Sequence, residues 1–490
     1  MKRRELLLAS AFAGGLSLTG TVQASASTRE HFDVVVIGSG FAGLAAAYEA
    51  AQQGVSVLVC EKMPSFGGNS ALCAGDMAVP GSPIQKKLGI IGDSAKVMEA
   101  DLLRAGLGKP TAHLRAMCTN ALPTWEWTAY ELGVDWNYDI IQNDWGQTYP
   151  RGITNKARSG FSIIKALLDG LERKKTVLRS MTRMERILMN PDGSVNGVRV
   201  RGDYRFGHDD SGEAYDIACR GLVLAYGGFS ADVAFRSQFD PRLTERIPTS
   251  NQPGATSEGW IEAERIGANL IDVDKIQVMS WNSGDELGLG QAWGLIEYVT
   301  LPYGMWVAQK SGRRIARPND SPKKRTETIL DLSSFGDSAY ALVPSSLSLN
   351  LGIFSKQVFD LITQGVIEEY PSLEAFALDK GTSMLNLMQS ARETFPAQAD
   401  AFIASPWLAV NVIPKVHHCM GGLEINGQSR VLSRTNRRPI TGLFAAGEAT
   451  GGVFKTARMP SHSCTDALVM GRIAGQSASE LVHNMRINGG

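Results

Sequence analysis

The residues with the clearest chemical signature form a glycine-rich segment near the N-terminus. Gly38, Gly40 and Gly43 fit the pattern Gly-x-Gly-x-x-Gly. In a dinucleotide site the first glycine permits a tight turn, the second lets the backbone approach a pyrophosphate, and the third lets a helix pack closely on a strand. Glu61 follows about twenty residues later, where a carboxylate accepts hydrogen bonds from ribose hydroxyls. These residue types at this spacing predict a dinucleotide-binding site.

The elements around this segment are those that such a site requires. Residues Val34–Ile37 are all apolar and predict a buried strand, and the alanine-rich stretch 42–53 predicts a helix ended by Gly54. A second buried strand is expected over Val55–Cys60. Together they predict a parallel β-α-β unit, whose helix N-terminus offers N–H groups and partial positive charge to phosphates.

Further glycine-rich segments are spread along the chain. They are Gly67–Ser70, Gly442–Gly452, and residues 225–229, which follow an expected buried strand at Leu222–Ala225. A long, deeply enclosed cofactor contacts many segments of a chain, whereas a dissociable nicotinamide contacts fewer. The distribution therefore favours FAD as the dinucleotide.

Length and composition exclude several classes of protein. The chain has 490 residues with 49 basic and 49 acidic side chains, which disfavours a nucleic-acid binder. Hydrophobic residues make up 43% of the chain, which is enough for a sizeable core and argues against disorder. After residue 26 no apolar run approaches the ~20 residues that span a bilayer, so we expect no integral membrane protein.

The first 26 residues have the three parts of an export signal. Lys2, Arg3 and Arg4 precede an apolar stretch over residues 6–18, and small residues stand at 24–26. The arginine pair indicates the twin-arginine route, which exports folded proteins with their cofactors. We expect a periplasmic protein with its signal at 1–26; an ordinary export signal and an uncleaved anchor are the alternatives.

The cysteines are few and scattered. The chain has six of them: Cys60, Cys73, Cys118, Cys219, Cys419 and Cys464. The sequence contains neither a Cys-x-x-Cys spacing nor the Cys-x-x-Cys-His motif that attaches haem. We expect no bound metal, no dithiol redox site and no covalent haem, and interpret most of the cysteines as small buried hydrophobic residues.

A change of composition divides the chain near its middle. Residues 283–400 mix helices with charged loops, and strand-like, glycine-rich sequence then returns up to the end. The predicted fold class is α/β. Its dinucleotide-binding domain is built from residues 30–282 and 401–490, and residues 283–400 form a second domain inserted between these parts.

Segments over nearly the whole chain after residue 26 resemble the soluble fumarate reductase and flavocytochrome c family, whose members are relatives of the succinate dehydrogenase flavoprotein subunit. The segments, in the family's order, are VVVIGSGFAGLAAA, EKMPSFGGNS, VLAYGGF, NQPGATSEGWIEAERIGA, PKVHHCMGG, GLFAAGEATGGVFKTAR and DALVMGRIAG. The resemblance implies a Rossmann-like FAD-binding domain interrupted by an α+β capping domain, with the active site between them.

The resemblance also implies a reaction. In this family a C=C bond activated by a carboxylate receives a hydride from flavin N5 and a proton from an arginine of the capping domain. His418 matches the substrate-binding histidine, and His417 beside it orients it or approaches the flavin. Arg458 matches the arginine that grips the substrate carboxylate, a task suited to a bidentate guanidinium.

The matching segments assign further residues. Thr256, Ser257 and Glu258 match a Thr-Gly-Asp segment near substrate and flavin, and Glu448 matches an acidic residue that contacts the ribityl part of FAD. The residues expected to hold FAD are Gly38, Gly40, Phe41, Ala42, Gly43, Glu61, Lys62, Gly67, Gly68, Asn69, Ser70, Gly75, Ala225, Gly227, Gly228, Gly447, Glu448 and Ser463. No histidine stands at the matching position beside Ser70, so we expect noncovalent FAD.

The chain departs from the family pattern at a position that bears on the substrate. Met279 stands where the family often has a histidine that holds the distal carboxylate of fumarate. Methionine carries no charged donor, and burying an unpaired carboxylate is costly. We therefore expect a monocarboxylic or bulkier unsaturated acid rather than fumarate.

Two further departures lie beside the expected flavin and in the capping domain. Residues 459–463 replace a Leu-Gly-Gly-Asn-Ala segment, which makes His462 a candidate polar contact with the substrate. A gapless match puts Pro322 where the proton-donating arginine should stand, so Arg325 is the first candidate for that role and Arg317 the second. Arginine is a poor acid, so the role needs burial and a relay partner; a solvated basic loop is the alternative.

Three functions are compatible with these residues. The first is a periplasmic reductase of an α,β-unsaturated carboxylate, such as a urocanate-, methacrylate- or cinnamate-like acid, in anaerobic respiration. Its electrons would come from a separate c-type cytochrome or a quinol-linked partner. The second is a flavin dehydrogenase of a saturated acid or a ketosteroid, and the third is a non-catalytic FAD-binding subunit.

Overall fold

Apolar segments from four distant parts of the chain form one buried sheet. Its strand order is β19-β20-β10-β2-β3-β6, with β19 antiparallel to β20 and the other pairs parallel. The strands are β2 (Val34–Ile37), β3 (Val57–Cys60), β6 (Val177–Arg179), β10 (Gly221–Leu224), β19 (Arg430–Leu432) and β20 (Pro439–Ala445). The computed structural model describes residues 30–106, 108–348 and 355–488, so the predicted export signal lies outside the described residues.

The first β-α-β unit has the predicted order and nearly the predicted bounds. β2 covers the predicted residues, and α1 (Phe41–Gln52) begins one residue before the predicted start. β3 begins at Val57 rather than at Val55, which is buried but precedes the ladder. The later strand β10 is shifted by one residue from its predicted bounds.

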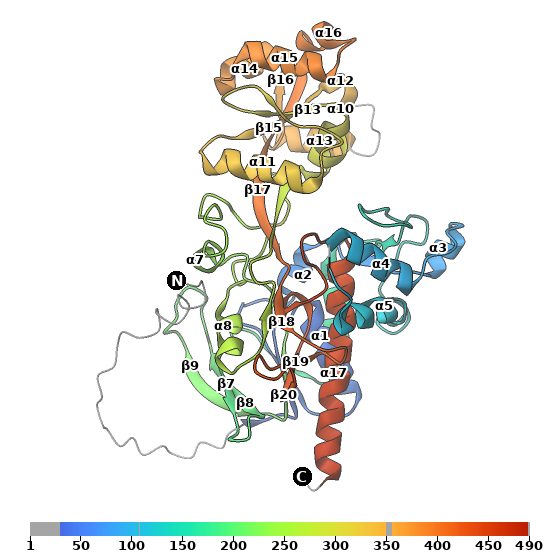
Figure 1. Ribbon diagram of the computed structural model, residues 1–490, viewed down its shortest axis with the longest axis vertical. Coiled ribbons are helices and arrows are strands. Elements are labelled where there is room, and N and C mark those ends of the chain that lie inside the picture. The colour runs from blue at the N-terminus through green and yellow to red at the C-terminus, as the bar shows by residue number, and fades with distance from the viewer. Residues whose placement is uncertain (1–29, 107, 349–354, 489–490) are drawn as a thin grey trace.

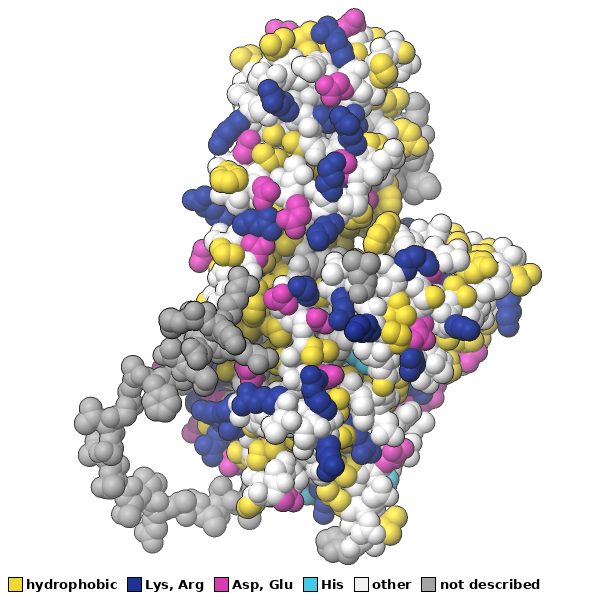
Figure 2. Space-filling view, in the orientation of Figure 1, with side chains coloured by type: hydrophobic (Ala, Val, Ile, Leu, Met, Phe, Trp, Pro, Cys, Tyr) yellow, Lys and Arg dark blue, Asp and Glu magenta, His cyan; other side chains and the backbone are white. Residues whose placement is uncertain are grey.

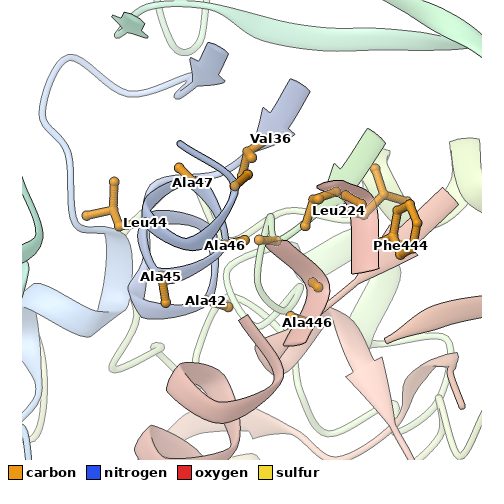
Figure 3. Close-up of a cluster of buried hydrophobic side chains, with 14 of the residues drawn as sticks. Val36, Ala42, Leu44, Ala45, Ala46, Ala47, Leu224, Phe444 and Ala446 are labelled. Carbon is orange, nitrogen blue, oxygen red and sulfur yellow. The ribbon is translucent and has the colours of Figure 1, made fainter. Parts of the chain in front are cut away.

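The core of this lower domain is made of small and branched side chains. Figure 3 shows alanines of α1, among them Ala46, packed between Val36 of β2 and Leu224 and Phe444 on neighbouring strands. All four side chains are almost completely buried. Small residues on α1 let the helix lie close to the sheet, which holds its N-terminus at the carboxyl ends of the strands.

The C-terminal helix α17 (His462–Ile487) packs against α1 along the lower domain (Figure 1). Two glycines set the distance between the helices. A Cβ built at Gly471 would lie 2.4 Å from the Ala42 carbonyl oxygen, and one at Gly475 would lie 2.2 Å from the Ala46 carbonyl oxygen. Neither position has room for a side chain.

Smaller sheets and helices complete the lower domain. Its four-stranded sheet has the order β1-β9-β8-β7, its three-stranded sheet β11-β18-β21 and its two-stranded sheet β4-β5. These strands are β1 (Glu30–His31), β4 (Met77–Ala78), β5 (Gly152–Ile153), β7 (Arg183–Met189), β8 (Val195–Gly202), β9 (Glu213–Ala218), β11 (Leu270–Ile271), β18 (Gly422–Glu424) and β21 (Thr450–Gly451). The helices are α2 (Gly68–Leu72), α3 (Pro83–Lys87), α4 (Ala95–Gly106), α5 (Ala112–Tyr130), α6 (Gly160–Arg173), α7 (Val233–Arg236), α8 (Glu258–Arg265) and the 3₁₀ turn η4 (Gly447–Ala449).

The upper domain in Figure 1 has a sheet of its own. Its order is β12-β17-β15-β13-β14, with β16 also paired to β17. The strands are β12 (Ile276–Asn282), β13 (Met305–Ala308), β14 (Arg314–Ala316), β15 (Ala339–Pro344), β16 (Glu368–Tyr370) and β17 (Trp407–Cys419). The helices are α9 (Trp293–Leu295), the π-helical turn η2 (Ile296–Thr300), α10 (Leu301–Tyr303), α11 (Pro322–Ser334), α12 (Ser345–Ser348), α13 (Ser355–Thr363), α14 (Leu373–Lys380), α15 (Met384–Thr394) and α16 (Ala399–Ile403).

The long strand β17 joins the two domains. Its residues 407–412 pair with β15 in the upper domain, and residues 413–419 pair with β12 on the way down to the main sheet. Of the predicted domain limits, residue 282 is the last residue of β12 and residue 400 lies within α16. The upper sheet thus uses residues from both sides of the predicted insertion.

Neither sign of charge dominates the face of the molecule shown in Figure 2. Figure 2 shows basic and acidic side chains interspersed on the visible face, as expected for a chain with equal numbers of both. Among the described residues, no helix combines the length and the apolar character needed to cross a bilayer.

The contact between α1 and α17 leads to a stability prediction. We expect Gly475→Ala to destabilise the protein by about 1–3 kcal/mol, because the added methyl group meets the Ala46 carbonyl. Helix propensity alone predicts the opposite sign, a gain of about 1 kcal/mol. Denaturant unfolding measures the difference, with Glu480→Ala on the exposed face of α17 as the control. A Gly475→Ala protein as stable as wild type would contradict the close packing.

Candidate active site

A cavity of about 1410 Å³ extends from the carboxyl ends of the main sheet to the upper domain. Most residues that the sequence assigned to FAD and to substrate share its wall. These are Gly38, Gly40, Phe41, Ala42, Glu61, Lys62, Gly68, Asn69, Ser70, Gly75, Ala225, Gly227, Thr256, Glu258, Met279, His417, His418, Gly447, Glu448, Arg458 and Ser463. The structure therefore brings both sets of residues to one place.

The other assigned residues are not part of the wall. They are Gly43, Gly67, Gly228, Ser257, His462, Arg317 and Arg325. Gly43 acts through packing, since a Cβ there would lie 1.9 Å from the Gly38 carbonyl oxygen. Gly228 leaves space for the Glu448 side chain, since a Cβ built at Gly228 would lie 2.4 Å from Glu448 Oε1. The Ser257 hydroxyl donates to Asp232 over 2.6 Å.

The glycine-rich turn presents an open helix N-terminus to the cavity. Gly38 has a φ of 101°, and a Cβ there would lie 2.3 Å from the Ala225 carbonyl oxygen. Gly40 is the N-cap of α1 and provides no side-chain cap. The Phe41 N–H donates to the Ser70 hydroxyl at 3.0 Å, which ties the second glycine segment to the first. Such a helix end favours an anion.

Glu61 lies at the end of β3, as expected for a ribose-binding carboxylate. It is 6% exposed and accepts hydrogen bonds from the Ser39 N–H at 3.1 Å, the Ser39 hydroxyl at 2.6 Å and the Met63 N–H at 2.9 Å. The Ser39 hydroxyl in turn accepts from the Gly67 N–H at 3.0 Å. One serine therefore holds the carboxylate and the second glycine turn in a fixed relation.

These features fit FAD. The cavity offers a glycine cradle that a Cβ would fill, an open helix N-terminus for the pyrophosphate and a carboxylate for the ribose. Lys62 pairs with Glu258 and also donates to the Thr256 hydroxyl. The buried hydroxyl of Tyr226 has no partner among the described residues, and burial raises its pKa well above the usual value. An extended polar cofactor matches this lining.

Arg458 is a buried cation at the other end of the cavity. It is 9% exposed, its Nε donates to the Gln277 side chain at 2.8 Å, and its Nη1 donates to the Ser463 hydroxyl at 3.1 Å. Within the described part of the chain, Nη2 has no hydrogen-bond partner and is left for a ligand. Burial lowers the pKa of Arg458, but a guanidinium stays charged in proteins.

Two neutral histidines lie beside this cation on β17. Burial and the charge of Arg458 hold the pKa of both His417 and His418 well below the usual value. The Nδ1 of His417 lies 2.6 Å from the Ser250 hydroxyl, and its carbonyl accepts from the Asn251 amide at 2.9 Å. His418 Nδ1 is 3.5 Å from Glu448 Oε1. A neutral imidazole can still donate one N–H to a substrate oxygen.

Glu448 shares this desolvated site. Burial raises its pKa to about 7. The hydrogen bond that its Oε1 accepts from the Cys419 N–H at 2.8 Å acts in the opposite direction and lowers the pKa. The side chain comes from η4, at the end of β20, so the main sheet positions it.

Apolar side chains line the side of the cavity toward the upper domain. Met279, on β12, is 6% exposed, and Trp281, Trp293, Leu295 and Tyr298 line the same side. The rings of Trp293 and Tyr298 pack edge to face with centroids 5.7 Å apart. Charged residues of the upper domain, among them Lys323 and Glu327, line the cavity as well, and the apolar part of the wall suits an apolar substituent.

The basic loop of the upper domain places its arginines away from the cavity. Arg317 is exposed, whereas Arg325 is 4% exposed and pairs with Glu297 at 3.2 Å. Pro322, the first residue of α11, lines the cavity instead, at a position that suits proline because a helix start needs no N–H donor there. Glu297 also lines the cavity, and burial raises its pKa.

His462 differs from its expected position. The sequence suggested a polar contact with substrate, but the fully buried ring is not part of the cavity wall. Its Nδ1 lies 2.7 Å from the Pro460 carbonyl oxygen, and burial lowers its pKa to about 3. The αL conformation of Ser461, with a φ of 66°, precedes this turn into α17. Ser461, and not His462, lines the cavity.

Two further site residues were not identified from the sequence. Gln277 orients Arg458, and Glu297 brings a carboxylate with an unpaired, buried Oε2 into the cavity wall. The acid within the apolar segment Gly294–Leu301 was the available signal for Glu297, because an acid in such a run needs a partner when buried. The sequence carried no local signal for the contact of Gln277 with a residue 181 positions away.

The fold and the cavity define a class: α/β flavoproteins with a second domain inserted over the FAD site. The family model described as "FAD binding domain" matches residues 33–464, and the chain belongs to this family. It is an FAD-binding oxidoreductase.

Several characterised proteins are similar to this chain over most of its length. The acrylate reductase flavoprotein subunit of Shewanella woodyi is 31% identical over 91% of this chain and 90% of its own length. The urocanate reductase of Eggerthella lenta is 31% identical over 92% and 75%. The solved open conformation of a flavocytochrome c3 fumarate reductase is 26% identical, with a TM-score of 0.80 over 92% of this chain and 79% of that one.

The raised pKa of Glu448 leads to a pH prediction. Because the folded state holds this proton more tightly than the unfolded chain, Glu448 contributes stability at low pH that is lost as the pH rises from about 4.5 to about 7. Glutamine does not titrate, so Glu448→Gln should gain about 3 kcal/mol relative to wild type between pH 4.5 and 8.

Urea unfolding at several pH values measures this difference. Glu245→Gln, at an exposed position, is the control and should follow the wild-type pH profile. Parallel pH profiles for Glu448→Gln and wild type would show that folding does not raise the pKa of Glu448.

Proposed function

We propose that this protein is an FAD-dependent reductase of a C=C bond conjugated to a single carboxylate, with an apolar substituent on the substrate. The observation that carries the proposal is the asymmetry of the cavity. A buried arginine and two neutral histidines lie at one side, and Met279 and aromatic side chains line the other. The acrylate and urocanate reductases to which the chain is similar support reduction of an unsaturated acid.

Arg458 binds the substrate carboxylate in this proposal. Its Nε and Nη1 are held by Gln277 and Ser463, so the guanidinium enters the complex with its orientation already set. The neutral imidazole of His418 donates a hydrogen bond to a carboxylate oxygen. As negative charge develops on that carboxylate during reduction, a fixed cation and a fixed dipole in a desolvated cavity stabilise it.

Bound FAD supplies the hydride, and the chain must supply the proton. Glu297 lines the cavity, and its Oε2 has no hydrogen-bond partner among the described residues. Burial raises its pKa and so favours the protonated form that can donate, while a carboxyl group remains a stronger acid than a guanidinium. Arg325 holds the other carboxylate oxygen. We infer that Glu297 delivers the proton to the substrate. Arg325 then acts as a positioning residue, because its ion pair with Glu297 fixes the orientation of that carboxyl group.

The proposals for cellular location and electron donor rest on the sequence alone. We infer export to the periplasm from the basic, apolar and small-residue parts of the first 26 residues. Electrons then come from a separate c-type cytochrome or a quinol-linked donor, and FAD is bound noncovalently.

Reoxidation of the reduced flavoprotein by a panel of acids tests the function. Flavin absorbance is followed without oxygen after addition of acrylate, crotonate, methacrylate, cinnamate, urocanate, itaconate or fumarate. We expect fast reoxidation by a monocarboxylate and slow reoxidation by fumarate. Arg458→Ala should retain FAD and lose at least about 100-fold in rate, since a buried charge pair with the carboxylate is removed.

Other outcomes of this panel are informative. Fast reoxidation by fumarate would contradict the role given to Met279. Reoxidation by none of the acids, together with flavin reduction by a saturated acid or a 3-ketosteroid, would establish the dehydrogenase instead. The apolar lining of the upper side is the observation that favours this second candidate.

Glu297→Gln tests the proton source. We expect reoxidation of reduced flavin by the preferred acid to slow by about 100-fold or more, with substrate affinity retained, because an amide cannot supply the proton. Glu327→Gln is the matched control, since Glu327 lines the same cavity but pairs with Arg242. A Glu297→Gln enzyme with the wild-type rate would exclude this residue as the acid.

A further inference from the structure

Two cysteines far apart in the sequence meet in the flavin cavity. The Sγ atoms of Cys73 and Cys464 lie 3.8 Å apart, across 391 positions of sequence. Both thiols are free, and both residues line the cavity. The chain has no Cys-x-x-Cys motif, so only the fold reveals this pair.

The elements that carry the two cysteines belong to the FAD side and to the substrate side. Cys73 ends α2, the helix that begins in the second glycine segment, and its thiol donates to the Ser70 carbonyl at 3.1 Å. Cys464 lies in the first turn of α17, directly after Ser463, which holds Arg458. The pair therefore lies between the cofactor segment and the substrate arginine.

The local structure leaves room for the thiols to react. The Cys73 carbonyl accepts from the Gly160 N–H at 2.7 Å, and a Cβ at Gly160 would lie 2.7 Å from Cys73 Sγ. Glycine at 160 thus provides the space that the Cys73 side chain occupies. Disulfide formation requires the two sulfurs to approach from 3.8 Å to about 2.05 Å, a movement of less than about 2 Å.

The electrostatics of the two thiols differ. The hydrogen bond with Cys464 lowers the pKa of Cys73, whereas the same contact and burial raise the pKa of Cys464 well above its usual value. The charge of Arg458 acts on both sulfurs. Cys73 is thus the nucleophilic partner and Cys464 keeps its proton.

We propose that Cys73 and Cys464 form a redox-active pair that closes to a disulfide and exchanges two electrons with FAD bound in the same cavity. On closing, two S–H bonds are lost, one S–S bond forms, and two electrons and two protons leave the pair. Oxidised FAD accepts the two electrons with protons and becomes reduced. The reverse transfer opens the disulfide and leaves FAD oxidised. The pair gives the enzyme a second two-electron store beside its flavin.

An anaerobic reductive titration tests this. The oxidised holoenzyme is titrated with dithionite while flavin absorbance is recorded. Wild type should take up four electrons per flavin, because disulfide and FAD are each two-electron couples, and Cys73→Ser and Cys464→Ser should each take up two. Cys118→Ser is the matched control, since this buried thiol lies outside the cavity, and should behave as wild type.

Mass spectrometry of the wild-type protein gives a readout independent of turnover and of variant folding. Oxidised and fully titrated samples are unfolded in an alkylating reagent and digested. We expect a linked Cys73–Cys464 peptide in the oxidised sample and two alkylated peptides in the reduced one. Two free thiols in the oxidised sample would overturn the proposal, and so would a linked peptide that persists when the flavin is fully reduced.

Discussion

The whole site depends on glycines at which two backbone segments approach so closely that no side chain would fit between them. At the start of α1 the backbone of Gly43 lies so close to Gly38 that a Cβ at Gly43 would be 1.9 Å from the Gly38 carbonyl oxygen. A Cβ at Gly38 would in turn be 2.3 Å from the Ala225 carbonyl oxygen. On the other face of α1, Gly471 and Gly475 bring α17 down to the backbone of α1. These contacts place the N-terminus of α1 and the first turn of α17, with Ser463 and Cys464, at the wall of the same cavity.

A second constraint is the burial of the charged and titratable side chains around Arg458. Arg458 is charged and desolvated, and its field, added to burial, keeps His417 and His418 neutral. The same burial raises the pKa of Glu448. Among the described residues Arg458 forms hydrogen bonds but no direct ion pair, although the nearby carboxyl groups of Glu448 and Asp144 act on its charge. In the proposed complex, the substrate carboxylate would be its first direct ion-pair partner. That is the condition under which binding an anion recovers the cost of burying the guanidinium.

The parts that could be predicted from sequence are those in which the signal is local. The strand at Val34–Ile37, the glycine turn and Glu61 follow one another in about thirty residues, so their period and spacing identify them. The family segments then located His418 and Arg458. What sequence could not supply depends on distant contacts. Gln277 reaches Arg458 across two domains, His462 turns away behind Pro460, and Cys73 meets Cys464 only after α17 has packed on α1.

Pro322 stands where the resemblance to the family places the proton-donating arginine, and this difference changes the chemistry of the cavity wall. Proline is well suited to the start of α11, and it removes any acid or base from that point of the cavity wall. The nearest buried arginine on α11 faces Glu297 rather than the cavity. Glu297 itself comes from a π-helical turn, a geometry often found at functional sites because it projects one residue out of register. Burial raises the pKa of Glu297, so this carboxyl group holds a proton more readily than an exposed one and is still a far stronger acid than a guanidinium. The absence of an arginine at position 322 is therefore compatible with the proposed protonation of the substrate by Glu297.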